Sequence, residues 1–273
     1  METIFTAIII VGGVAAISGL AIGIISRAFA VKENPLKAAI EECLPGANCG
    51  GCGYPGCAGY AQALADGKTT DTAACSPGGN ATLKRIAELL GTDAVEKECE
   101  VARLACYGTN DHCGTRYKYD GIKTCAAANL LNGGPKSCPF GCIGFGDCTP
   151  VCKFDAIAMD SDGLPHVNEE KCTGCGKCVT ACPKKILSLQ KISRKVFLRC
   201  TSTDTGKEVR EYCTVGCIGC GICAKKCPEG ALTMKDNIPV WDWSKCTSCG
   251  ICAEVCPRKI IFYQGKPGKE KNA

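Results

Sequence analysis

The chain opens with one long apolar stretch, which has no counterpart later in the sequence. Residues 4–25 are apolar or small and carry no charge, and about 20 such residues are enough to span a bilayer as a helix. A cleaved signal peptide is the alternative, but the start Met1-Glu2-Thr3 lacks the positive charge that such peptides carry. We therefore predict a retained transmembrane anchor over residues 1–30.

The charges that flank this anchor predict its orientation. Arg27, Lys32 and Lys37 follow the apolar stretch, whereas only Glu2 precedes it. Because positive residues stay on the cytoplasmic side, we expect a single pass through the inner (cytoplasmic) membrane, with the soluble part in the cytoplasm. Ala15, Gly19 and Gly23 recur at every fourth position, which either lets another helix approach closely or reflects how common small residues are in membrane spans.

The next apolar periodicity is helical. Asn34 and Pro35 are typical of a helix N-cap and first turn, and the helix should run to about Cys43. Residues 80–90 predict a second helix, with Gly91 at its C-terminal stop. We assign residues 31–95 to a small N-terminal domain.

Further along, the apolar segments shorten to strand length. Residues 157–159 and 232–234 are each followed by a turn, at 162–163 and 236–237, and predict two hairpins. We also expect strands at 196–198 and 208–212, on either side of a turn at 204–206. The soluble part is therefore predicted to be α+β.

Composition changes this picture, because the soluble part is poor in large apolar residues and rich in cysteine. The chain has 273 residues, of which 27 are cysteines. An odd number of cysteines grouped in metal-type spacings indicates thiolates that bind metal in a reducing compartment, not disulfides. Metal binding should then supply much of the folding free energy.

The net charge of +5 does not by itself indicate a nucleic-acid partner. A [4Fe-4S] cluster with four thiolates carries about −2, so several clusters would make the working protein negative. We expect no nucleic acid, and we interpret residues 265–273 as a solvated basic tail.

The most specific motif, CxxCxxCxxxCP, occurs twice within residues 217–257. In two-cluster ferredoxins three cysteines of one motif and the fourth of the other share a cluster. Structural zinc is the alternative, but zinc sites usually draw on two separated cysteine pairs. The predicted ligand sets are Cys217, Cys220, Cys223 and Cys256 for one cluster and Cys227, Cys246, Cys249 and Cys252 for the other.

A glycine-rich loop in the N-terminal domain carries a different spacing. Cys49, Cys52 and Cys57 form CxxCxxxxC, and Cys75 is the expected fourth ligand. A redox dithiol at the first two cysteines is the alternative, but the nearby Cys57 favours a cluster. A GxGxxG match at residues 51–56 is not a dinucleotide site, because no strand precedes it.

An internal repeat predicts two tandem ferredoxin modules, at 133–195 and 196–264, after a connecting segment at 96–132. The repeat places Phe145 where the second module has the ligand Cys220. We expect Cys138 to fill that vacancy, with Phe145 packed over the cluster; a three-iron cluster is the alternative. The first module should thus use Cys138, Cys142, Cys148 and Cys182 for one cluster and Cys152, Cys172, Cys175 and Cys178 for the other.

Five clusters of this kind use 20 of the 27 cysteines. The remaining seven are Cys43, Cys99, Cys106, Cys113, Cys125, Cys200 and Cys213. The repeat aligns Cys125 with Cys200. A sixth cluster held by Cys106, Cys125, Cys200 and Cys213 is one possibility, and buried thiols are the other.

These features together resemble the B subunit of the Rnf complex, its membrane-anchored iron-sulfur component, and the stretch LPGANCGGCGYPGC at residues 44–57 is the most specific part of the resemblance. The resemblance implies an electron-transfer subunit of a membrane-bound, ion-translocating ferredoxin:NAD oxidoreductase. It further implies soluble ferredoxin as electron donor and the other Rnf subunits as partners, with nicotinamide and flavin chemistry elsewhere in the complex.

Two other functions fit the sequence less well. An iron-sulfur subunit of a hydrogenase or formate dehydrogenase would not explain the CxxCxxxxC domain after the anchor. A cluster-based sensor should carry a DNA-binding or signalling segment, and the sequence indicates neither. The two histidines, His112 and His166, lie in no catalytic pattern, so no catalytic residue is predicted in this chain.

Overall fold

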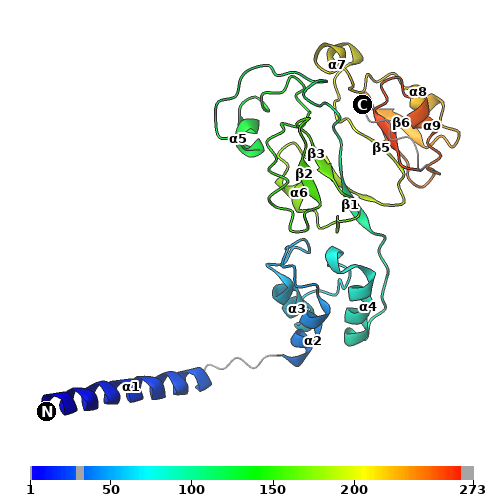
Figure 1. Cartoon of the computed structure of the whole chain (residues 1–273). Helices are drawn as coiled ribbons and strands as arrows, with labels where there is room; N and C mark the ends of the chain where they lie inside the picture. Colours follow the sequence, from blue (N-terminus) through cyan, green and yellow to red (C-terminus); the bar gives the residue numbers. More distant parts are fainter. Residues whose placement is uncertain (1, 29–33, 266–273) are drawn as a thin grey trace.

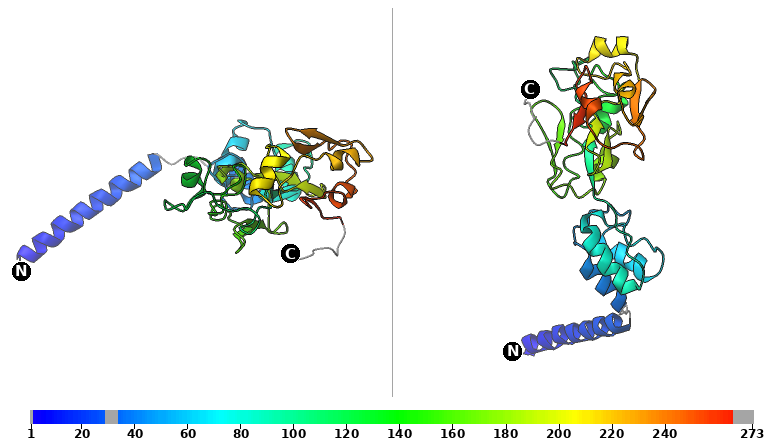
Figure 2. Two further views of the ribbon diagram at one scale, coloured as in Figure 1. Left: turned by 90° about the horizontal axis from the view of Figure 1, so that it is seen from above. Right: turned by 90° about the vertical axis from the view of Figure 1, so that its right-hand side faces the viewer.

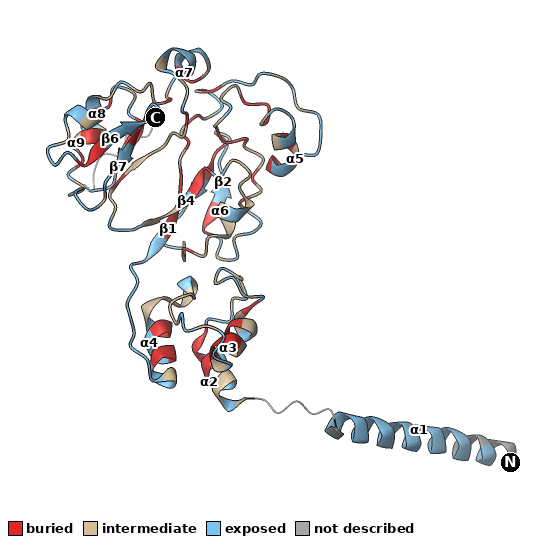
Figure 3. Cartoon of the chain, turned by 180° about the vertical axis from the view of Figure 1, so that it is seen from behind, coloured by how far each residue is buried: buried red, intermediate tan, exposed pale blue. Residues whose placement is uncertain are grey.

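The computed structural model describes residues 2–28 and 34–265. The first element, α1 (Glu2–Ala28), is the one helix in these ranges that is long and apolar enough to cross a membrane. Its described side chains are exposed (Figure 3). The chain therefore has an N-terminal helix suited to a bilayer. Lys32 and all but the first residue of the predicted basic tail lie outside the described residues.

Three helices form the N-terminal domain: α2 (Pro35–Cys43), α3 (Cys57–Ala65) and α4 (Gly79–Leu90), with a short 3-10 helix at Ser76–Gly78. The Asn34 side chain accepts the Leu36 N–H at 3.0 Å, and Gly91 adopts φ 65° after α4. Both predicted helices are thus confirmed. Their apolar faces meet at Ile40, Tyr60 and Ile86, which are at most 1% exposed.

Four two-stranded antiparallel sheets make up the rest of the molecule (Figure 1). In each half, the first and last strands pair as an outer sheet and the two middle strands form a hairpin. The outer sheets are β1 (Glu100–Leu104) with β4 (Leu187–Lys191) and β5 (Val196–Leu198) with β8 (Ile261–Tyr263). The hairpins are β2 (Ile157–Met159) with β3 (Pro165–Val167) and β6 (Leu232–Lys235) with β7 (Ile238–Trp241). Both predicted hairpins are confirmed.

Short helices lie between the strands, each of them close to a cysteine motif. They are α5 (Cys125–Leu130), α6 (Lys177–Ala181), α7 (Gly206–Tyr212), α8 (Ile222–Lys225) and α9 (Ile251–Glu254). Figures 1 and 2 show α2, α3 and α4 as a separate unit, joined to the sheets by the segment that leads into β1.

Two predictions differ from the structure. Residues 208–212 are not a strand but part of α7, because Thr205 and Glu208 form a capping box in which the carboxylate accepts the Thr205 N–H at 2.8 Å. The segment 96–132 does not simply connect domains either. It contains β1, whose Ala102 lies opposite Leu189 of β4.

Arg103 of β1 ties the two modules together. Its side chain is 3% exposed and contacts both carboxylate oxygens of Glu169, at 3.1 and 3.2 Å. It also donates to the Arg194 carbonyl at 2.6 Å and to Gln264 Oε1 at 2.8 Å. A buried guanidinium therefore joins the first module, the segment between the modules and the residue that follows β8.

Candidate iron-sulfur centres

The second module brings its eight motif cysteines together in two groups. One cavity, with a volume of about 340 Å³, is lined by Cys217, Cys220, Cys223 and Cys256. The other, of about 300 Å³, is lined by Cys227, Cys246, Cys249 and Cys252. Each group takes three cysteines from one motif and one from the other, as the crossed arrangement predicts.

The spacing of these thiols fits a cluster better than a single metal ion. Four sulfurs that bind one zinc ion at 2.3 Å lie ~3.8 Å apart. In the described part of the chain, no three cysteine sulfurs lie within 4.8 Å of one another. The chambers are therefore wider than a zinc site, and the residues present fit a larger group such as [4Fe-4S].

The first module has a matching chamber beside its hairpin. Cys152, Cys172, Cys175 and Cys178 line a cavity of about 350 Å³. The Ala102 N–H donates to Cys172 Sγ and the Ala156 N–H to Cys152 Sγ, each at 3.4 Å. Such N–H···S bonds orient and stabilise thiolate ligands. One of the two donors belongs to β1, so this strand supports the site directly.

The chamber next to Phe145 differs from the sequence prediction. Cys142, Cys148 and Cys182 line a cavity of about 370 Å³, but its fourth cysteine is Cys125, not Cys138. Phe145 packs with Cys125 and Ile143, and its ring lies tilted against that of Tyr119, with ring centroids 5.5 Å apart. The Phe145 side chain thus packs against Cys125, the fourth cysteine of this cavity.

The start of α5 explains why Cys125 reaches this position. Both carboxylate oxygens of Asp147 accept backbone N–H groups, from Cys125 at 2.8 Å and from Ala126 at 2.9 Å. Thr124 caps the same helix through the Ala127 N–H. A capped helix N-terminus is therefore fixed by a residue two positions from Phe145. The sequence signal for this arrangement is Asp147 itself, because the second module has the apolar Ile222 at the equivalent position.

In the N-terminal domain, Cys49, Cys52, Cys57 and Cys75 lie around the loop before α3. Burial is the main factor that raises the pKa of Cys75, and the other three thiols raise it further. Asn48 holds the loop closed, because its side-chain oxygen accepts the Cys57 N–H at 2.8 Å. The structure thus brings the four predicted cysteines together.

This loop packs directly against the first module. A Cβ atom at Gly51 would lie 2.7 Å from the Cys175 carbonyl oxygen and 3.0 Å from its Cβ. Lys153 also donates to the Asn48 carbonyl at 3.0 Å. Gly51 therefore allows a backbone approach that a larger residue would prevent, and one cysteine loop touches the next.

Burial makes several thiols of the proposed cluster sites hard to ionise. It is the main cause that raises the pKa of Cys148 to about 12 and those of Cys178 and Cys252 to about 11. At neutral pH these side chains would be neutral thiols, so binding of a metal centre must release their protons. The chambers are built for thiolates that a metal stabilises.

Five of the remaining cysteines meet between the modules: Cys106, Cys113, Cys138, Cys200 and Cys213. The structure also corrects the repeat: Cys106 follows β1 as Cys200 follows β5, so Cys106, and not Cys125, is the counterpart of Cys200. Cys43 is buried in the helical domain, where its thiol donates to the Ala39 carbonyl, and Cys99 is exposed.

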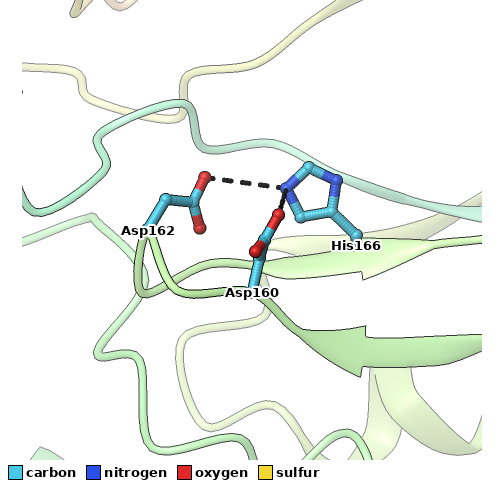
Figure 4. A group of neighbouring side chains, drawn as sticks. All are labelled: Asp160, Asp162 and His166. Atoms are coloured by element: carbon cyan, nitrogen blue, oxygen red, sulfur yellow. Dashed lines mark ion pairs between the residues drawn. The ribbon is translucent and has the colours of Figure 1, made fainter.

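The described residues contain one other group with metal-ligand character. Asp160, Asp162 and His166 lie on the β2–β3 hairpin, and His166 Nε2 is 3.6 Å from an oxygen of each carboxylate (Figure 4). The imidazole and the Asp160 side chain are more than half exposed. We interpret this group as a surface ion-pair arrangement.

Comparison with known proteins agrees with this arrangement. An Fe-S cluster family model matches residues 44–77, and 4Fe-4S dicluster models match residues 140–189 and 216–260. A third dicluster model matches residues 171–232, which bridge the two modules.

Three relatives are each 41% identical to this chain, and each is named as the B subunit of its complex. That of the Na(+)-translocating ferredoxin:NAD(+) oxidoreductase complex of Acetobacterium woodii aligns over 90% of this chain and 73% of its own length. That of the proton-translocating complex of Clostridium ljungdahlii aligns over 89% and 86%, and that of the ion-translocating oxidoreductase complex of Methanosarcina acetivorans over 89% and 92%. The chain therefore belongs to the B-subunit family of the ion-translocating ferredoxin:NAD oxidoreductase (Rnf) complexes, as an iron-sulfur subunit that carries electrons.

Proposed function

We propose that this chain accepts electrons from soluble reduced ferredoxin and passes them through five [4Fe-4S] clusters to other subunits of an Rnf complex. Each cluster, when bound, supplies reversible one-electron transfer. The proposed ligand sets are Cys49, Cys52, Cys57 and Cys75; Cys152, Cys172, Cys175 and Cys178; Cys125, Cys142, Cys148 and Cys182; Cys217, Cys220, Cys223 and Cys256; and Cys227, Cys246, Cys249 and Cys252.

The contact between Gly51 and Cys175 is the observation that carries this proposal. It places the loop of the N-terminal site directly against the loop of a first-module site. A chain that only stored iron would not need two sites in backbone contact. For electron transfer, this contact gives a short path between the domains.

We assign an anchor at 1–30 and a helical domain at 31–95 from their helices, and two modules at about 100–195 and 196–264 from the sheet pairing. The apolar α1 supports insertion into the cytoplasmic membrane. Arg27 lies in the last turn of this helix and Lys37 follows it, so the positive-inside rule favours the modules on the cytoplasmic side, where ferredoxin is available.

Mixing experiments test the function. The full chain, purified without oxygen in detergent and then oxidised, should lose part of its visible cluster absorbance when reduced ferredoxin is added. Replacing Gly51 with valine should slow electron transfer between the N-terminal cluster and the module clusters, because the side chain would push Cys175 away. Clusters that stay oxidised in the presence of excess reduced ferredoxin would contradict the proposed donor.

A further inference from the structure

A chamber between the two modules gathers cysteines that none of the five proposed ligand sets uses. Its volume is about 380 Å³, which is close to the 340 and 370 Å³ of the cavities beside Cys217 and Cys142. Five cysteines line it: Cys106, Cys113, Cys138, Cys200 and Cys213. The first module contributes Cys106, Cys113 and Cys138, and the second contributes Cys200 and Cys213, so only the folded arrangement of the two modules brings them together.

Four of these cysteines form two pairs that the repeat relates. Cys106 follows β1 and Cys200 follows β5, the first strand of each module. Cys138 lies four residues before the ligand Cys142, and Cys213 lies four residues before the ligand Cys217. Cys113 has no counterpart in the second module. Such twofold repetition is expected for a site that two copies of one module build jointly.

Backbone hydrogen bonds connect this chamber to a cluster site on each side. The Cys142 N–H donates to Cys106 Sγ at 3.5 Å, and the Cys217 N–H donates to Cys200 Sγ at 3.4 Å. Each donor belongs to a residue that lines a neighbouring cluster site. The N–H···S geometry is that of a stabilised thiolate ligand. The chamber therefore lies between the two modules' nearest cluster sites.

Positive charges around the chamber indicate an anionic occupant. Lys136 is 6% exposed and its ammonium donates to the Gly108 carbonyl. Arg199 lies over the rings of Tyr107 and Phe262, at 4.6 and 4.5 Å from their centroids. Within residues 2–28 and 34–265, neither cation has a carboxylate within 4.0 Å. Burying a lysine without a counter-charge is costly, and an anionic centre would remove that cost.

We propose that the chamber holds a sixth [4Fe-4S] cluster, bound by Cys106, Cys138, Cys200 and Cys213, which conducts electrons from one module to the other. On binding a preformed [4Fe-4S]²⁺ core, the four thiols release four protons as four Fe–S bonds form, which leaves a net charge of about −2 beside the two cations. This inference rests on the proposed electron-transfer function. It replaces Cys125 of the sequence-based set with Cys138.

Iron and acid-labile sulfide content tests the site. The full chain should contain about 24 of each per molecule, against about 20 for five clusters. Cys138→Ala and Cys213→Ala should each lose about four iron atoms, together with the electron paramagnetic resonance signal of one reduced cluster. Cys113→Ala is the matched control, because it removes a thiol that lines the same chamber and should keep all the iron.

Three results would overturn the proposal: about 20 iron atoms in the wild-type chain, one zinc ion per chain, or loss of a cluster in Cys113→Ala but not in Cys200→Ala. A folding defect is recognised separately, because it would also remove iron from the other five sites. If the chain holds about 24 iron atoms but is not reduced by ferredoxin, the proposed function fails while the sixth site stands. If ferredoxin reduces a chain that holds only about 20 iron atoms, the proposed function stands while the sixth site fails.

Discussion

At the scale of single residues, Cys125 supplies the thiol that the first module lacks at position 145. It lines the same cavity as Cys142, Cys148 and Cys182, and Asp147 fixes the backbone that presents it. We expect Cys125→Ala to lose about four iron atoms per chain, or to retain a three-iron cluster, because no other cysteine lines that cavity. Iron analysis and electron paramagnetic resonance of the purified chain measure this.

The control is Cys99→Ala, which removes an exposed thiol and should leave the iron content unchanged. Asp147→Asn should also lower the iron content, but by less than Cys125→Ala, because an amide oxygen can still accept one of the two N–H bonds. A full set of clusters in Cys125→Ala would show that another residue closes this site.

At the scale of elements, Arg103 of β1 links the β1–β4 sheet to the second module through its hydrogen bond to Gln264. Burial opposes ionisation of Glu169, but hydrogen bonds from Arg103 and Gln264 outweigh it and lower the pKa of this carboxyl group. The group's stabilising contribution is therefore complete above its unfolded pKa of ~4.3, and it is lost as the pH falls through the lower folded value. At neutral pH the contact contributes fully.

We expect Arg103→Met to lower the free energy of unfolding by about 3 kcal/mol at pH 7, since it leaves a partly buried carboxylate and two acceptors without their donor. Anaerobic denaturant titration, followed by cluster absorbance, measures this. Lys171→Met removes an exposed cation that neighbours a ligand, and should change stability by less than about 0.5 kcal/mol. Equal effects of the two substitutions would contradict a specific role for Arg103.

The elements also differ in how far they depend on iron. The helical domain has an apolar core around Ile40, Tyr60 and Ile86, whereas the cores of the two modules include cysteines that line the cluster sites, among them Cys142, Cys148, Cys223 and Cys252. Removing iron with a chelator should therefore unfold the modules first, because metal-thiolate bonds replace apolar packing there.

Limited proteolysis with mass spectrometry tests this order of unfolding. The chelated chain should be cut first within residues 100–265, while residues 34–90 survive longer. The untreated holoprotein is the control and should resist cleavage in both regions. Earlier cleavage between α2 and α4 would show that the helical domain also depends on its cluster.

At the scale of the whole molecule, α1 is independent of every proposed cluster site. The first cysteine of the chain is Cys43, and the described side chains of α1 are exposed. Removing residues 1–28 should therefore give a soluble protein with unchanged iron content, because it removes the one helix of the described residues that is long and apolar enough to cross a bilayer. Flotation with liposomes and iron analysis measure the two properties, with the full-length chain as control. Loss of iron on truncation would show that α1 belongs to the folded domain.

Sequence alone determined the features whose cause is local. The spacing within residues 217–257, the Asn34 cap, the Gly91 stop and the two hairpins each depend on neighbours a few positions apart. The helix over residues 206–212 also has a local cause, its capping box, although the turn at 204–206 predicted a strand over residues 208–212. The apolar stretch at 4–25 likewise indicated a membrane helix without knowledge of the rest of the fold.

Only the tertiary structure decided which distant cysteines meet. The segment at 107–137 is longer than its counterpart at 201–212. A constant shift along the repeat therefore aligned Cys125 with Cys200, and Cys138 was assigned to the ligand position left vacant by Phe145. Pairing of β1 with β4 instead makes Cys106 the counterpart of Cys200. The hydrogen bond from the Cys125 N–H to Asp147 holds Cys125 beside the position that lacks a cysteine ligand. The physical reason is that the order of residues along the chain limits local geometry, whereas strand pairing and helix capping bring together thiols from segments far apart in the sequence.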